Sequence, residues 1–171
     1  MFSPHAAAAG RNLEGAFLSQ FSHADLGHLV FNMLTLYFFG PVVEGHLGFH
    51  FFTIYFAAGI AALLAVFLLR KGDPDYRVLG ASGSITGILF AAIVLLPDMA
   101  VRFLIIPFPI PAPVFAVIYL LLSTWLMSRG DLARISHEAH VGGALTGLLL
   151  GGVLAPRGFD PLMGRIRDLV S

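Results

Sequence analysis

Five long apolar runs, separated by short polar clusters, form the main pattern of this sequence. They cover about residues 26–43, 49–69, 82–96, 114–127 and 138–154, and most charged residues lie between them. Apolar runs of this kind with charged flanks are typical of membrane-spanning helices. The pattern therefore predicts an all-α, polytopic transmembrane helix bundle with about five spans.

Proline and glycine set the expected ends of these helices. The first run should end at Gly40-Pro41 and the third at Pro97, because proline lacks the N–H that continues a helix. Four prolines predict an extended segment along the membrane interface before the fourth run: Pro107, Pro109, Pro111 and Pro113. Several runs are shorter than the roughly 20 residues that cross a 30 Å hydrocarbon core, so we expect a thin bundle.

Residues 1–171 are interpreted as a single membrane domain. Its N-terminal segment, 1–22, is polar and lacks the apolar core of a cleavable signal, so none is expected. A charged loop over 128–136 joins the fourth and fifth runs, and an Arg-containing C-terminal tail covers 157–171.

Composition narrows the possible chemistry. Hydrophobic residues make up 57% of the chain and charged residues 12%, where about 25% is typical of soluble domains. The net charge is zero, so there is no basic surface for phosphates and no nucleic acid partner is expected. The absence of cysteine excludes disulfides, a thiolate nucleophile and cysteine-bound metal. Any reaction would use Ser, His, Asn, Asp or Glu, and no cofactor is predicted.

His28 and Asn32 are polar side chains inside the first run. They are four residues apart, so they share one helix face and can converge on a single point. Each could simply be a hydrogen-bonded packing contact between helices. Two donors on one face of a low-dielectric site also suit a developing oxyanion, which is the interpretation we favour for the pair.

Ser82 opens the third run in Gly80-Ala81-Ser82-Gly83, where a flexible loop becomes a helix. Free backbone N–H groups and the positive end of the helix dipole lie at such a start, and both would stabilise an oxyanion. The serine is equally compatible with a helix N-cap, and Gly83 and Gly87 with simple helix packing.

His140 opens the fifth run, and glycines repeat every four residues from Gly143. Such a stripe lets helices approach closely, and Gly83 offers a matching surface, so we expect His140 beside Ser82. A neutral imidazole within reach of a serine hydroxyl can act as its general base, which predicts a Ser-His dyad. Glu138 lies about 200° around the helix from His140, so it should face elsewhere, at the membrane interface.

Together, three segments resemble the rhomboid family of intramembrane proteases, over about residues 23–151. The family's signatures are a histidine followed four residues later by asparagine, Gly-x-Ser-Gly, and Ala-His-x-Gly-Gly. They correspond here to 28–32, 80–83 and 139–143, in the family's order. The resemblance implies a rhomboid-like bundle that cleaves peptide bonds in transmembrane segments. The implied partners are transmembrane protein substrates and the lipid bilayer.

The resemblance also implies a role for each matching residue. Ser82 would be the nucleophile and His140 the base, while His28, Asn32 and the Ser82 backbone N–H would bind the oxyanion. Structural support is implied for four positions: Gly80, Gly83, Gly143 and Glu44, the last matching a structural carboxylate of the family.

Three departures from the family pattern stand out. The five spans begin at the family's second helix, so its first has no counterpart here. Thr86 stands where an aromatic residue usually follows the serine by four positions, so the ring that packs on the catalytic histidine is expected to be missing or replaced. The Trp-Arg pair of some members is absent, since the only tryptophan is Trp125.

The resemblance implies an integral, multi-pass protein of a plasma or inner membrane, with its site open to the extracytoplasmic side. That orientation places 70–77 and 128–136 outside. Positive charge does not favour it, because six Lys and Arg residues then lie outside and four inside. The outer six are Arg11, Arg70, Lys71, Arg77, Arg129 and Arg134, and the inner four are Arg102, Arg157, Arg165 and Arg167.

Two other functions remain open. A rhomboid-like protein that binds transmembrane clients without cutting them is suggested by Thr86 and the missing first helix. A metalloprotease or metal carrier would use His137 and His140, which lie three residues apart. This segment is one residue short of the H-E-x-x-H zinc signature, and no further ligand motif follows it.

Overall fold

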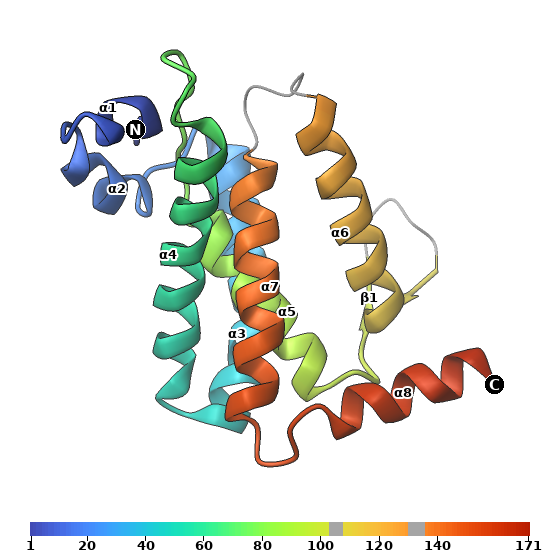
Figure 1. Ribbon diagram of the computed structural model, residues 1–171. Helices are drawn as coiled ribbons and strands as arrows, with labels where there is room; N and C mark the ends of the chain where they lie inside the picture. Colours follow the sequence, from blue (N-terminus) through green and yellow to red (C-terminus); the bar gives the residue numbers. More distant parts are fainter. Residues whose placement is uncertain (103–107, 130–135) are drawn as a thin grey trace.

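The computed structural model describes residues 1–102, 108–129 and 136–171 (Figure 1). Its elements, in chain order, are α1 (Pro4–Ala8), α2 (Leu13–Ser19), α3 (Leu26–Leu47), α4 (His50–Arg70), α5 (Ser82–Leu95), β1 (Ala100–Val101), β2 (Ile110–Pro111), α6 (Ala112–Arg129), α7 (His137–Leu154) and α8 (Asp160–Val170). The strands form a short antiparallel pair, with Ala100 opposite Pro111. The predicted all-α bundle is confirmed.

Helix α5 is the centre of the bundle. Every residue from Gly83 to Val94 is buried, since α3, α4, α6 and α7 all contact this helix. In Figure 1, α4 and α7 run side by side with α5 and α3 behind them, and α8 lies crosswise at one end. At 14 residues, α5 is about 21 Å long, less than the roughly 30 Å hydrocarbon core.

The outward surfaces of α3 and α4 are apolar. Both helices are long and apolar enough to cross a membrane, yet only 17% and 28% of their apolar windows are buried. Large side chains such as Phe31, Tyr37 and Phe56 are exposed on them. A helix in the core of a soluble protein would bury such residues, so these surfaces are suited to lipid.

The predicted end of the first helix at Gly40-Pro41 is wrong. Helix α3 continues through Pro41 to Leu47. Proline removes only its own N–H bond to the preceding turn, whereas continuation buries Val43 and Leu47 in a cluster with Ile54. Packing therefore outweighs the single missing hydrogen bond.

The proline-rich segment is extended only in part. Ile110 and Pro111 form strand β2, as expected of an extended segment, but Pro113 belongs to the first turn of α6. A first-turn proline loses no intrahelical bond, which explains why the helix starts before it. Pro107 and most of the predicted 128–136 loop lie outside the described residues.

The N-terminal segment is tied to the loop that leads into α5. Phe2 forms an isolated antiparallel bridge with Val78, with both N–H···O distances 3.0 Å. The Gly80 N–H donates to the Ser19 carbonyl at 2.8 Å. Residues 1–19 therefore help to fix the chain just before Ser82.

Candidate active site

The start of α5 sets the position of Ser82. Gly80 has φ +110°, and a Cβ there would come within 2.7 Å of the His28 ring, so only glycine fits. Ala81, not Ser82, occupies the N-cap, and no side chain caps this helix. The N-cap interpretation of Ser82 is therefore wrong, and its hydroxyl is available for another contact.

The closest crossing in the bundle lies between α5 and α7. A Cβ added at Gly143 would overlap the carbonyl oxygen of Gly83, and one added at Gly147 would overlap that of Gly87. The backbones are therefore in direct contact, which confirms the close approach predicted from the glycine stripe.

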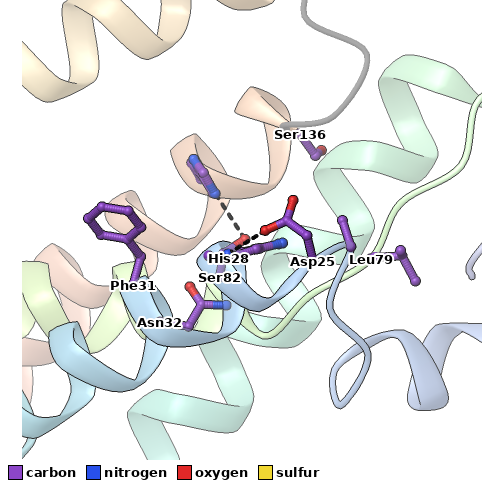
Figure 2. A pocket seen from close by; sticks show the side chains of 10 residues that line it. Asp25, His28, Phe31, Asn32, Leu79, Ser82 and Ser136 are labelled. Atoms are coloured by element: carbon purple, nitrogen blue, oxygen red, sulfur yellow. Dashed lines mark hydrogen bonds between the residues drawn. The ribbon is translucent and has the colours of Figure 1, made fainter.

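This crossing brings Ser82 and His140 together. His140 Nε2 lies 2.9 Å from Ser82 Oγ, the contact drawn as a dashed line from the Ser82 hydroxyl in Figure 2. Within the described part of the chain, no carboxylate is hydrogen-bonded to His140. Chemically, the pair can transfer a proton from the hydroxyl to the imidazole during nucleophilic attack.

A cavity of about 480 Å³ opens beside this pair. Its ten lining residues are Ala24, Asp25, Gly27, His28, Phe31, Asn32, Leu79, Ser82, Ser136 and His140. His28 and Asn32 thus share one face of α3, as their spacing predicts, and line the same cavity as the Ser82–His140 pair. The described residues offer no hydrogen-bond partner to the buried Nδ2 of Asn32, so this donor is available to a ligand.

The residues around His28 fix the start of α3. Asp25 caps this helix by accepting from the His28 backbone N–H at 2.8 Å. The His23 ring packs edge-on against the His28 ring, with centroids 5.3 Å apart. Burial, together with the nearby His28, lowers the pKa of His23 below its usual value.

Glu138, which we expected at the membrane interface, is buried within the bundle. Only 2% of it is exposed, and it forms an ion pair with Arg70 at the end of α4. The Tyr76 hydroxyl lies 3.1 Å from Glu138 Oε2 and 3.0 Å from the hydroxyl of Ser136, the N-cap of α7. Glu138 does point elsewhere than His140, as predicted, and its partners are Arg70 of α4 and Tyr76 of the following loop.

This buried network alters the acidity of its tyrosine. Burial raises the pKa of Tyr76 to about 12, and the neighbouring Glu138 carboxylate contributes to the increase. The network links the end of α4, the following loop and the first turn of α7. It therefore fixes the helix turn that carries His140.

Two rings flank His140. The His137 ring is edge-on to it, with centroids 6.2 Å apart and planes at 87°. The Tyr119 ring of α6 lies at the same centroid distance with planes at 35°. Tyr119 belongs to no motif in the sequence, so sequence reasoning missed it.

Two other sequence-based predictions lie outside this cluster. Glu44 is exposed near the end of α3, where its backbone carbonyl accepts from the Gly48 N–H at 2.7 Å, and its structural role stays a prediction. Among residues 1–102, 108–129 and 136–171, no three His, Asp or Glu side chains gather as a metal site would require.

Residues 11–157 match the family described as Rhomboid domain. The chain belongs to the rhomboid family. It is 32% identical over 142 residues to RHOMBOID-like protein 12, mitochondrial, of Arabidopsis thaliana. That alignment covers 74% of this chain, which spans only 42% of the relative's length. No solved structure matches the chain significantly.

Membership in the rhomboid family agrees with the lipid-suited surfaces of α3 and α4. The chain is a membrane protein, and rhomboids act on transmembrane substrates within the bilayer.

Proposed function

We propose that this chain is an intramembrane serine endopeptidase that cleaves transmembrane segments of membrane proteins. The observation that carries the proposal is the 2.9 Å contact between Ser82 Oγ and His140 Nε2, at a helix start beside a cavity. Nucleophile and base within hydrogen-bond reach are the arrangement that activates a serine.

The proposed reaction begins with attack of Ser82 Oγ on the substrate carbonyl carbon. His140 Nε2 takes the hydroxyl proton, and a tetrahedral intermediate with a negatively charged oxygen forms. His140 then gives this proton to the leaving amine as the C–N bond breaks, leaving an acyl-enzyme on Ser82. Water, deprotonated by His140, then attacks the ester carbon. His140 returns this proton to Ser82 Oγ as the acyl–oxygen bond breaks, which releases the acid product and the free serine.

Three donors are proposed to stabilise the oxyanion. The first is the Nδ2 of Asn32, which has no partner among the described residues, and the second is the imidazole of His28 on the same cavity wall. The third is the Ser82 backbone N–H, which lies in the first turn of α5 and has no intrahelical acceptor. Donors that are already oriented in a low-dielectric site need no reorganisation during the reaction.

The substrate must unwind locally before it can react. A helical segment directs its carbonyls along its own axis and keeps them hydrogen-bonded, so they cannot reach Ser82 inside the cavity. We therefore expect cleavage near small or helix-breaking residues. The apolar Phe31 and Leu79 on the cavity wall suit side chains of a transmembrane segment.

The decisive experiment is cleavage of a single-span substrate by the purified protein in liposomes. Wild type should cleave, whereas Ser82→Ala and His140→Ala should not. Ser22→Ala should behave as wild type, because Ser22 is not among the residues that line the cavity and its hydroxyl donates to the Leu18 carbonyl. Unchanged cleavage by Ser82→Ala would contradict the assignment of Ser82 as the nucleophile. Binding of the substrate without cleavage by wild type would favour an inactive, client-binding protein instead.

We further propose that the site opens to the extracytoplasmic side of a plasma or inner membrane. The cysteine-free chain allows a direct test with a membrane-impermeant maleimide. Gly72→Cys, beside the end of α4, should react from outside in intact cells, while Gly45→Cys, near the opposite end of the bundle, should react only after lysis. The reverse pattern would invert the topology.

A further inference from the structure

Tyr119 connects α6 to the proposed catalytic pair. Its ring packs on the His140 imidazole, with centroids 6.2 Å apart and planes at 35°. Its hydroxyl lies 3.4 Å from Thr86 Oγ1 on α5, one turn beyond Ser82. One side chain therefore contacts the helix of the proposed nucleophile and the side chain of the proposed base.

The Tyr119 ring is itself held in place. The fully buried Phe90 of α5 packs against it at 5.4 Å with planes at 62°, and Phe115 of α6 packs at 5.7 Å with planes at 48°. Aromatic rings at these separations and tilts attract one another. The ring that meets His140 is thus fixed by its neighbours and by its hydroxyl.

His140 needs such a contact, because no carboxylate among the described residues orients its imidazole. The Ser82 hydroxyl is the one hydrogen-bond partner that the described residues give this ring, so packing has to limit its rotation about the Cβ–Cγ bond. His137 meets the imidazole edge-on from the same helix, and Tyr119 supplies the contact from a different helix.

We propose that Tyr119 is the positioning residue of the proposed base, and that Thr86 acts through the Tyr119 hydroxyl. The inference rests on the proposed function. Thr86 has no ring that could pack on His140, and in this proposal Tyr119 of α6 supplies that ring instead. It also makes the rate of cleavage depend on α6, although none of the ten residues that line the cavity belongs to this helix.

The test compares kcat and KM in liposomes for Tyr119→Leu, Tyr119→Phe and Thr86→Val. Tyr119→Leu should lower kcat by about 10- to 100-fold with KM within about twofold, because misplacing a catalytic group by 1 Å can cost about 10²-fold. Tyr119→Phe keeps the ring and should restore most of this loss. The Tyr119 hydroxyl bonds to Thr86 and to Ser123, so Tyr119→Phe removes both bonds and Thr86→Val removes one of them. Each variant should lose about two- to fivefold in kcat, and adding Thr86→Val to Tyr119→Phe should cause no further loss.

Tyr55→Leu is the matched control. Tyr55 is a half-buried tyrosine of α4 that packs on Phe51, in a cluster without His140. Its replacement should also lower thermal stability, because it removes a packed ring, yet leave kcat within about twofold of wild type.

Each outcome decides between the two proposals. A Tyr119→Leu variant with wild-type kcat, alongside an inactive Ser82→Ala, would overturn the role of Tyr119 and leave the proposed function standing. Both proposals would be overturned if wild type does not cleave, or if Ser82→Ala cleaves as fast as wild type. If Tyr119→Leu fails to fold, the Tyr119→Phe and Thr86→Val cycle decides: losses that add, or no loss, contradict the proposal.

Discussion

Gly143→Ala adds one carbon at a point of direct backbone contact in the α5–α7 crossing. That Cβ would overlap the Gly83 carbonyl oxygen, which belongs to backbone and cannot turn aside like a side chain. Helix α7 must therefore retreat by on the order of 1 Å to restore an ordinary contact distance. His140 lies three residues earlier on the same helix and should move with it.

Two energies compete in this substitution. Overpacking a tight contact costs about 1–3 kcal/mol. Alanine recovers about 1 kcal/mol because it is the better helix former. The net loss of stability should thus be about 0–2 kcal/mol, whereas a 1 Å shift of the proposed base should lower cleavage by about 100-fold. The effect on activity should exceed the effect on stability.

The assay measures thermal unfolding and substrate cleavage on the same preparations, with Gly45→Ala as the control. Gly45 is a helical glycine on α3 with nothing within 4 Å of an added Cβ, so the same change there should stabilise by about 0.5–1 kcal/mol and spare activity. The reasoning fails if Gly143→Ala is as stable and as active as Gly45→Ala.

Three further predictions follow from buried polar groups. Asn32→Leu should cut kcat by about 10²- to 10³-fold in the cleavage assay, because it removes a proposed oxyanion donor. Thermal stability should be equal or higher, because Nδ2 has no partner among the described residues. A drop in both kcat and stability would indicate a packing role. Arg70→Ala should destabilise the protein more than Glu138→Gln does in thermal unfolding. The arginine variant leaves the Glu138 carboxylate, which is 2% exposed, without its cation, at a cost of about 3–5 kcal/mol. Equal losses in the two variants would contradict this prediction. The raised pKa of Tyr76 means that its neutral form stabilises the fold below about pH 10, the ordinary tyrosine value, and that this contribution is lost as pH rises toward about 12. The unfolding temperature should therefore fall less steeply over that range in Tyr76→Phe, and identical slopes would contradict the prediction.

Local sequence patterns were sufficient to predict the meeting of Ser82 and His140. The apolar runs predict the helices, and the glycines at fixed spacing predict which two helices cross in backbone contact. Helix α5 begins at Ser82, as predicted from the flexible Gly80-Ala81 before it. Each of these sequence patterns lies within a few residues of the structural feature that it predicts.

Features that depend on distant partners could not be predicted in this way. The burial of Glu138 is compensated by Arg70, 68 residues earlier, and nothing near Glu138 indicates such a cation. Continuation of α3 through Pro41 follows from tertiary packing of Val43 and Leu47. Tyr119 looks like any aromatic residue of an apolar run, since only the fold brings its ring to His140.

The most direct test of the proposed dyad is covalent labelling of Ser82 by a fluorophosphonate, located by mass spectrometry on the protein in liposomes. Wild type should be labelled at Ser82, and His140→Ala should react at least about 100-fold more slowly, as expected when a serine loses its general base. Equal labelling rates in the two proteins, or no label at Ser82 in wild type, would contradict the dyad.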